Sequence, residues 1–372
     1  MIQIREARSK KEMKAFVRYP FGLYRKSPYW VPPIVREELN SFDPKINPVF
    51  NQAEARFFLA TRNGKPVGRV AAIVNWGEVR DQGLKKMRFG WFDFEDDPDV
   101  SRALLEKVAE VGREHGLEYM EGPMGFSNLD KVGVLTEGFD HIGTMVTWYN
   151  HPYYARHLEK LGFAVEKEYI ESKFPASNAH PKFFMRVEGL IRERYGLRPL
   201  NFKKIDDLLP WVDQMFDLFN TSYAGLASFV AISEAQKAYM KKKFISFINP
   251  EYIKFVLDRE DRMIAFAIVM PSYSRALQKA GGRLFPTGFL HLIRARKYNR
   301  DAIFYLIGIR PEYQNKGVTA IIFRAYHEVF TKKKVQMCFR TPELADNIAI
   351  QQIWKNFDPE IYQRRCTYRK SL

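Results

Sequence analysis

The chain has 372 residues, with a hydrophobic content of 46% and an aromatic content of 15%. A chain of this length exceeds the size at which a single hydrophobic core stops growing, so we expect two domains. The apolar content is enough for packed cores and argues against disorder. No apolar run approaches the roughly 18 residues of a membrane span. The N-terminal stretch MIQIREARSKKEMKAF carries charges where a signal peptide would be apolar. Because only Cys338 and Cys366 are present, we expect no disulfide framework and a reducing compartment. Together these features predict a cytoplasmic protein without a membrane partner.

The formal net charge of +16 is divided unequally along the chain. Residues 1–176 hold 26 Lys and Arg against 25 Asp and Glu, a net charge of +1, and residues 177–372 hold 33 against 18, a net charge of +15. The second half is therefore expected to meet a polyanion, which could be a phosphorylated cofactor, nucleic acid or a membrane surface. Charge alone does not choose among the three.

The first half shows a mixed pattern of strands and helices. Residues 54–74 predict a hairpin that turns at Asn63-Gly64, and residues 87–96 predict a strand. Residues 99–116 have the periodicity of an amphipathic helix. A Gly-rich connection, a helix at 153–163 and a closing strand at 166–174 follow.

The second half repeats this order of elements, although the two halves have no similar sequence. We expect a helix at 208–226, a hairpin at 251–271 and a buried strand at 302–309. The chain then predicts, in turn, a helix at 319–331, a strand at 334–340, a helix at 346–357 and a closing strand at 360–371. The fold class is α/β of the mixed type. The prolines at 175, 181 and 199 place the junction between a domain at 1–175 and a domain at 176–372.

The turn between the strand at 302–309 and the following helix reads RPEYQNKGVT, residues 310–319. The first N–H groups of a helix have no intrahelical partner, and the helix dipole favours an anion beside them. A glycine at such a turn lets the backbone approach a phosphate closely. The turn therefore predicts a phosphate site, although an ordinary strand–helix connection would also accept a glycine.

Strand, PEYQNKG turn and helix resemble the acyl-CoA pyrophosphate loop of the GNAT superfamily of N-acyltransferases, whose signature is Gln/Arg-x-x-Gly-x-Gly/Ala. Gln314 and Gly317 fill the first and fourth positions, and Thr319 replaces the small last residue. The segment DNIAIQQIWKNF resembles the later helix of that family, in which an Asn precedes an ending that contains an aromatic residue. Asn347 corresponds to that Asn. The stretches at 19–34, 121–140, 150–163 and 281–317 resemble bacterial tandem-GNAT proteins.

The resemblance implies two tandem GNAT-like domains, each with a splayed mixed sheet, and a bound acetyl-CoA or other acyl-CoA. It implies a cofactor site in the second half, built from the backbone or side chains of Ile309, Arg310, Gln314, Asn315, Lys316, Gly317, Val318, Thr319 and Asn347.

The first half carries the family's end signature, LEKLGF at 158–163, but its loop position reads FEDDPDVSRALLEKV. Asp96, Asp97 and Asp99 stand where a pyrophosphate would need amides and positive charge. Such carboxylates cap the helix themselves and repel a phosphate. We therefore expect the first domain to have lost its cofactor loop.

Acyl transfer to an amine needs a base for the ammonium proton and an acid for the leaving thiolate. The family often uses a Tyr of the last helix as the acid, but Trp354 and Leu158 hold that position here. Our candidate is Tyr305 on the cofactor strand, and a core tyrosine with a satisfied hydroxyl is the alternative. Asn128 and Asp130 either face the acceptor or are turn residues.

The first hypothesis is an acyl-CoA-dependent N-acyltransferase that acts on a small-molecule or peptide amine. A Fem-type aminoacyl transferase, which uses charged tRNA and also pairs two GNAT-like domains, is the second. A binding module without catalysis, favoured by the missing Tyr, is the third. Outside the tRNA hypothesis no nucleic-acid partner is expected, and no metal spacing is found among the seven histidines.

Overall fold

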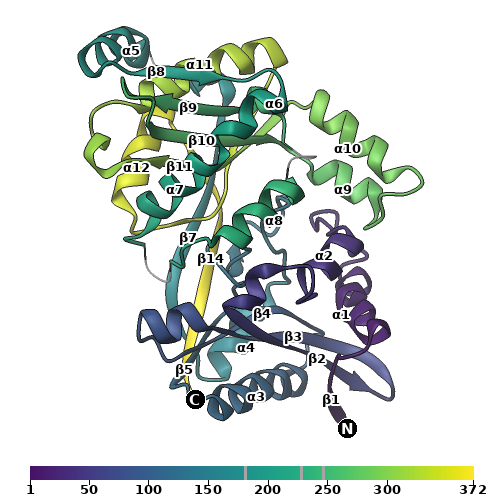
Figure 1. The fold of residues 1–372 in the computed structure, drawn as a ribbon. Coiled ribbons are helices and arrows are strands. Elements are labelled where there is room, and N and C mark those ends of the chain that lie inside the picture. Colours follow the sequence, from purple (N-terminus) through teal and green to yellow (C-terminus); the bar gives the residue numbers. More distant parts are fainter. Residues whose placement is uncertain (180–181, 227–228, 245–247) are drawn as a thin grey trace. The chain divides into compact units, whose positions relative to one another are not determined.

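The computed structural model describes residues 1–179, 182–226, 229–244 and 248–372 (Figure 1). The chain forms two compact units. The first contains Met1–Ile170, Ser274–His291 and Tyr362–Leu372, and the second contains Glu171–Tyr273 and Leu292–Ile361. The units are thus not two continuous stretches, and the division into folding domains at 175/176 stays a prediction.

The first unit holds the helices α1 (Lys10–Leu23), α2 (Val35–Ser41), α3 (Pro98–Glu114), α4 (Tyr153–Lys160) and α9 (Ser274–Ala280). Its strands are β1 (Ile2–Glu6), β2 (Ala53–Arg62), β3 (Lys65–Asn75), β4 (Lys86–Phe94), β5 (Tyr119–Gly122) and β6 (Val134–Glu137).

The second unit holds the helices α5 (Lys182–Tyr195), α6 (Ile205–Leu208), α7 (Val212–Tyr223), α8 (Glu234–Phe244), α11 (Thr319–Lys333) and α12 (Ile348–Trp354). Its strands are β8 (Arg198–Asn201), β9 (Ile253–Leu257), β10 (Met263–Pro271), β11 (Asp301–Ile309), β12 (Met337–Arg340) and β13 (Glu343–Leu344). Three elements have residues in both units, namely β7 (Ala164–Pro175), α10 (Gly288–Lys297) and β14 (Glu360–Ser371).

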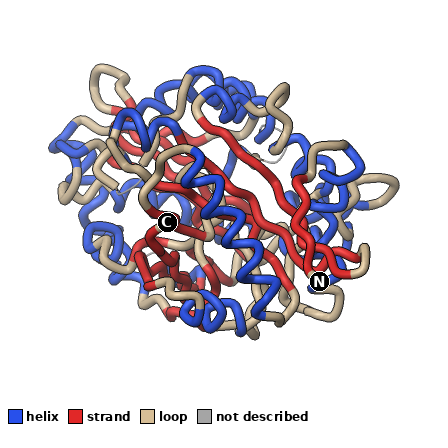
Figure 2. The backbone as a smooth tube through the Cα atoms, turned by 90° about the horizontal axis from the view of Figure 1, so that it is seen from below, coloured by secondary structure: helices blue, strands red, loops and turns tan. Residues whose placement is uncertain are grey.

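The sheet of the first unit has helices on both faces. Successive side chains of a strand point to opposite faces. Phe57 of β2 therefore packs in one core with Phe16 of α1, and its neighbour Phe58 packs in the other core with Leu104 of α3. Figure 2 shows α3 lying across the face that is turned toward the viewer. The predicted hairpin is confirmed, because β2 and β3 pair antiparallel around Asn63-Gly64, both with a positive φ.

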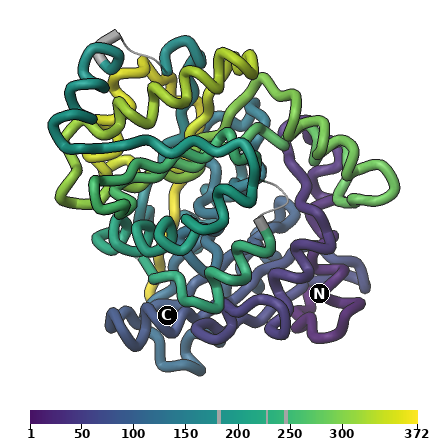
Figure 3. Tube along the Cα trace, turned by 45° about the horizontal axis from the view of Figure 1, so that its top comes forward, coloured from purple at the N-terminus to yellow at the C-terminus, as the bar shows by residue number. Residues whose placement is uncertain are grey.

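A late segment of the chain completes the first unit. Helix α9 and the loop after it lie beside the residues that follow α1 (Figure 3). The side-chain amide of Gln278 donates to the carbonyl oxygens of Pro28 and Trp30, and the N–H of Val35 donates to the carbonyl of Gly282. Residues Ser274–His291 of the segment between β10 and β11 thereby belong to the first unit.

The two closing strands have other partners than the sequence suggests. We expected 360–371 to close the second half, but Tyr368 of β14 lies opposite Gly122 of β5 in the first unit. Conversely, Phe174 of β7 lies opposite Cys338 of β12 in the second unit. The expected extents are close to those observed, and only the pairing differs.

The second unit packs its core between β9–β11 and helix α11. The core contains Ile264, Phe304, Phe323, Tyr326 and Trp354. Helix α5, where the sequence predicts only a junction, packs against α11. Both cysteines are buried free thiols. Among the described residues no helix is long and apolar enough to cross a membrane.

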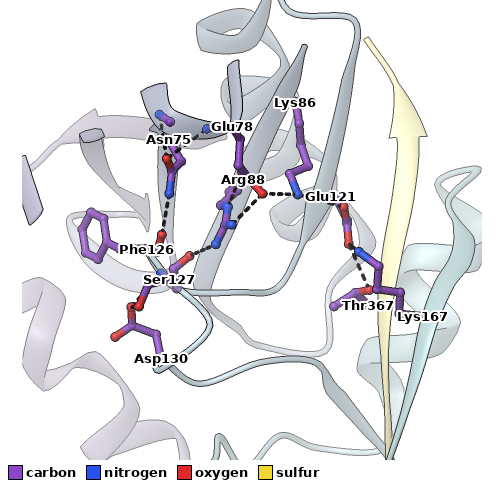
Figure 4. Close-up of polar contacts among 12 residues, drawn as sticks. Asn75, Glu78, Lys86, Arg88, Glu121, Phe126, Ser127, Asp130, Lys167 and Thr367 are labelled. Atoms are coloured by element: carbon purple, nitrogen blue, oxygen red, sulfur yellow. Dashed lines mark hydrogen bonds and ion pairs between the residues drawn. The ribbon is translucent and has the colours of Figure 1, made fainter. Parts of the chain in front are cut away.

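A buried ion network holds the first unit together beside β4 (Figure 4). The carboxylate of Glu78 accepts from both the Nε and the Nη2 of Arg88 at 2.7 Å and lies 2.6 Å from the Nζ of Lys86. Arg88 also donates to the carbonyl of Gly125 at 2.9 Å. Burial alone would raise the pKa of Glu78, but the charges and hydrogen bonds of Arg88 and Lys86 outweigh it and lower this pKa.

We predict that Glu78→Gln lowers the free energy of unfolding by about 3 kcal/mol, because it leaves the buried Arg88 without its carboxylate and Lys86 with only Glu121, at 3.4 Å. Urea unfolding measures the change. Glu118→Gln is the matched control, since Glu118 pairs with Lys85 on the surface and its loss should leave stability unchanged. The lowered pKa fixes the sign of the pH dependence. The difference in free energy of unfolding between the unaltered protein and Glu78→Gln should be largest above the ordinary glutamate pKa of about 4.3. It should shrink as the pH falls below that value. Equal losses from both variants would contradict the role of the network.

Candidate active site

Tyr305, the predicted catalytic residue, lies in a β-bulge of β11. Strand β11 pairs antiparallel with β10, and the register shifts where Leu306 faces Ile268 and Phe304 faces Val269. Tyr305 is thus the extra residue of β11 at this point. A bulge bends the strand locally and re-aims its side chains, and bulges are common next to active sites.

The sheet opens beside β11 directly after the bulge. In the described part of the chain, β11 pairs with β12 only over Asp301–Phe304, although the strand continues to Ile309. The prediction of a splayed sheet in the second half is therefore confirmed. Beyond Phe304 none of the strands that the structure describes lies beside the edge of β11 that faces β12, so the backbone groups of this edge need other partners.

Three side chains supply partners for the carbonyl groups of this open edge. Thr341 Oγ1 donates to the carbonyls of Phe304 and Tyr305, each at 3.3 Å. The hydroxyl of Tyr223 donates to the carbonyl of Ile307 at 3.0 Å, and the side-chain amide of Gln314 donates to that of Ile309 at 3.3 Å.

The N–H groups of Ile307 and Ile309 point to the same edge. The N–H of the next residue, Arg310, bonds to β10 through the carbonyl of Ile264 at 2.9 Å. Since the N–H groups of successive residues in a strand alternate in direction, those of Ile307 and Ile309 turn away from β10. The edge thus presents capped carbonyls and outward N–H groups.

The loop from β11 to α11 contains two left-handed residues. Asn315 has a φ of +59° and Gly317 has a φ of +75°. Asparagine is among the few non-glycine residues that tolerate this region. Between these bends and the helix, Val318 has helical angles and α11 begins at Thr319. The predicted turn and helix start are confirmed.

The N–H groups of this loop are largely unused. In the ranges that the structure describes, no hydrogen bond is made by the N–H of Asn315, Gly317, Val318 or Thr319. Backbone N–H groups without a partner are rare in folded proteins unless water or a ligand bonds to them. At the N-terminus of a 15-residue helix, such groups form an anion-binding arrangement.

The need for glycine at position 317 has a second cause besides any ligand. A Cβ built on Gly317 would lie 2.5 Å from Cδ1 of Ile191 in α5. The ammonium of Lys316 lies 5.3 Å from the ring of Tyr195 at the end of the same helix and 5.2 Å from the ring of Tyr313. The unused N–H groups, rather than the glycine, therefore carry the evidence for a ligand.

The other predicted site residues make contacts with the protein itself. Arg310 donates through Nε to the carbonyl of Met263 at 2.9 Å. Asn347 is the N-cap of α12, and its side-chain oxygen accepts from the N–H of Ile350 at 3.3 Å. Arg310, Gln314 and Asn347 thus brace the loop and helix starts of this unit.

Trp354 and Leu158, at the family's tyrosine position, are core residues. Leu158 is fully buried in the first core, and Trp354 packs edge-on against Phe304 at 5.1 Å in the second. The indole N–H of Trp354 donates to Glu343 at 3.0 Å, and Glu343 pairs with the buried Arg340. Burial raises the pKa of Glu343, and Arg340 opposes that rise. Position 354 therefore anchors the end of β12 and offers no acid.

In the first unit, the corresponding edge of strand β4 is filled by backbone of the same unit. Strand β4 pairs with β5 only over Lys86–Arg88 among the described residues and also has a register shift, next to Trp91. Beyond it, the N–H of Met124 donates to the carbonyl of Phe89 at 2.8 Å. A Cβ at Gly90 would lie 2.3 Å from the carbonyl oxygen of Met124. The Gly-rich stretch thus replaces a ligand at this edge.

Carboxylates occupy the helix start of the first unit. Asp97 is the N-cap of α3 and accepts from the N–H of Asp99 at 2.8 Å, so the predicted capping is confirmed. Asp97 also pairs with Arg62, and Asp96 contacts His157 at 2.8 Å. Asp130 accepts from the N–H and hydroxyl of Ser127, which makes it a turn residue.

Sequence reasoning missed Tyr223, Thr341 and the Arg340–Glu343 pair. Tyr223 looks like one more aromatic residue of a helix, and Thr341 follows a short strand. A contact made by a side chain with a backbone group far along the chain leaves no local pattern.

No protein-family model matches the chain. Among curated proteins it is similar to Protein YghO of Escherichia coli K12, at 24% identity over 379 residues that cover 99% of this chain and 95% of that protein. It is also similar to the bacterial ceramide synthase of Caulobacter vibrioides, at 26% identity over 82% of this chain and 79% of that protein.

Solved structures match along the whole chain. A tandem GNAT protein from the clavulanic acid biosynthesis pathway aligns with a TM-score of 0.59 and 11% identity, over 100% of this chain and 98% of that one. A GCN5-related N-acetyltransferase from Sphaerobacter thermophilus aligns with a TM-score of 0.52 and 9% identity, over 100% and 95%. The chain resembles the GNAT superfamily and has the mixed α/β fold of a tandem GNAT protein.

Proposed function

We propose that the protein is an acyl-CoA-dependent N-acyltransferase whose second half binds the acyl donor. The observation that carries the proposal is the set of unused N–H groups at Asn315, Gly317, Val318 and Thr319, as judged over the described residues. They lie where the open-edged strand β11 leads into α11. The net charge of +15 on residues 177–372 agrees with an anionic ligand.

Each part of the site would hold a different part of the donor. The loop N–H groups and the dipole of α11 suit the pyrophosphate, and the exposed Lys316 adds a cation. The outward N–H groups of Ile307 and Ile309 suit the amide-containing arm, since an extended chain pairs with a free strand edge. Arg310, Gln314 and Asn347 keep these elements in place.

The bound donor supplies an activated acyl group as a thioester. The amine nitrogen forms the new amide bond, the carbon–sulfur bond breaks, the nitrogen loses a proton and the thiolate gains one. We propose that Tyr305 at the bulge delivers the proton to the thiolate. The open edge beside this residue leaves the reacting carbonyl accessible to the amine.

The similarity to a bacterial ceramide synthase suggests a class of acceptor. A ceramide is the amide of a fatty acid with a long-chain amino alcohol, so making one from an acyl thioester is an N-acyl transfer. We therefore propose long-chain amino alcohols as the first acceptors to test and include small amines and peptides in the same assay. Release of free thiol reports turnover with each acceptor.

We predict that CoA raises the melting temperature of the protein, because a ligand that binds only the native state stabilises it by about 2.7 kcal/mol at a hundredfold excess over Kd. Gly317→Glu should abolish the shift, since it adds a carboxylate where the phosphates would lie. Gly64→Glu is the control for backbone strain, because Gly64 also has a φ of +75° but turns a hairpin in the first unit, where a Cβ meets no atom within 4 Å. It should keep the full shift.

Lys316→Gln separates binding from folding, because Lys316 is exposed and its replacement strains no backbone. It should weaken CoA binding, and without CoA it should lower the melting temperature only slightly, through loss of the exposed contacts with the rings of Tyr195 and Tyr313. No shift with CoA in the unaltered protein would overturn the proposal. Binding of tRNA that weakens steeply with salt would then favour the aminoacyl-tRNA hypothesis.

A separate prediction concerns Tyr305. Tyr305→Phe should lower kcat by about 10²-fold or more if its hydroxyl protonates the thiolate, and it should leave CoA binding unchanged. Tyr326→Phe is the control, because the hydroxyl of Tyr326 lies in the core and contacts the carbonyls of Tyr252 and Ala267. It should lower stability and keep kcat. An unchanged kcat in Tyr305→Phe would assign Tyr305 to packing.

A further inference from the structure

The outward face of α10 carries apolar and cationic side chains together. Leu290, Ile293, Arg294 and Lys297 are all exposed, and their spacing of three, four and seven residues places them on one face of the helix. Leu290 is 53% exposed and Ile293 is 58% exposed. The opposite face is anchored by the buried Leu292.

The residues on either side of the helix continue this pattern. Phe285 before the helix is 72% exposed, and its ring lies 5.5 Å from that of Phe289. Tyr298 after the helix is 68% exposed, and the ammonium of Lys297 lies 5.2 Å from its ring. Arg283 and Arg300 extend the charge at both ends. We call this segment, residues 283–300, the α10 surface (Figure 1).

Two features set the α10 surface apart from an ordinary solvent face. The outward face of a helix in a soluble protein is usually polar, and large apolar side chains are normally exposed singly. In addition, none of Arg283, Arg294, Lys297 and Arg300 pairs with a carboxylate within the described part of the chain. The exposed cations thus lie beside exposed apolar groups without a carboxylate partner among the described residues.

We propose that the α10 surface binds the protein peripherally to a membrane of anionic phospholipid. Short amphipathic helices with Lys or Arg beside Leu, Phe or aromatic residues lie in the headgroup region, with their apolar side chains among the acyl chains. The cations meet the lipid phosphates, and Tyr298 has the amphipathic ring that favours the interface. The proposal replaces the expectation that the protein has no membrane partner, and it holds whether or not the protein transfers acyl groups.

Sedimentation with lipid vesicles tests the proposal on the full chain. The protein should sediment with vesicles of phosphatidylglycerol and phosphatidylcholine, and much less with phosphatidylcholine alone. Arg294→Gln with Lys297→Gln should lower the partition coefficient about 25-fold, from roughly fivefold for each cation. Leu290→Gln with Ile293→Gln should lower it at least about tenfold, because it removes the apolar contact.

Each double variant has a matched control on the same protein. Lys11→Gln with Lys14→Gln removes two exposed cations three residues apart on α1, and the net charge changes equally. Ile46→Gln with Val165→Gln removes two aliphatic side chains that are 45% and 48% exposed. Both control variants should bind vesicles as the unaltered protein does, and all four should keep its melting temperature.

Three outcomes would overturn the proposal. The first is an unaltered protein that stays in solution with anionic vesicles. The second is a loss of binding in the α1 control as large as that in the α10 variant, which would assign the attraction to the overall charge. The third is a change of oligomeric mass in Leu290→Gln with Ile293→Gln without any vesicle binding, which would assign the face to a second copy of the chain.

Discussion

The arrangement of both halves depends on one constraint, that the N–H and C=O groups of a strand edge must be satisfied. Among the described residues, strands β4 and β11 each extend past the part that pairs with their parallel neighbour, and each has a register shift nearby. Each therefore has an edge without a described strand beside it. In the first half, backbone groups of the same unit bond to this edge, and the N–H of Met124 donates to the carbonyl of Phe89. The second half supplies side chains that cap carbonyl groups. A carbonyl cap leaves the N–H groups of the same edge for a ligand, whereas a paired backbone closes the edge.

The same contrast recurs at the helix that follows each strand. The start of α3 is satisfied within the chain, because Asp97 caps it and Arg62 neutralises Asp97. The start of α11 has no side-chain cap, and two left-handed residues turn the loop before it. An uncapped helix start costs stability unless something bonds to it. The N–H groups on the open edge of β11 and those at the start of α11 lie next to each other along the chain, which points to a shared partner. One anionic, amide-containing ligand would satisfy both.

Local features of the fold were predictable from the sequence because they are decided by neighbouring residues. Asn63-Gly64 fixes the hairpin turn, and Asp97 with the apolar periodicity after it fixes the start of α3. The partners of β7 and β14 were not predictable, because two long strands at the ends of the two halves offer similar edges and only tertiary contacts choose between them. For the same reason the sequence places Gln314 and Gly317 in the site but not Tyr223 or Thr341, which come from other elements.

Trp354 and Leu158 are core residues, so neither can protonate the leaving thiolate in the proposed acyl transfer. This raises the importance of the base for the amine relative to that of the acid. A thiol of the cysteine type has a pKa of about 8.5, so its thiolate is a tolerable leaving group near neutral pH even without an acid. An alkyl ammonium of the lysine type has a pKa of about 10.4, so only about one molecule in 10³ carries a free lone pair at pH 7. For the proposed acyl transfer, the absence of a tyrosine at positions 354 and 158 is therefore a smaller handicap than the absence of a base would be. In that proposed reaction the group with the larger effect on turnover is the one that removes the proton from the amine, and a site that binds the amine in a poorly hydrated environment achieves part of this by lowering its pKa.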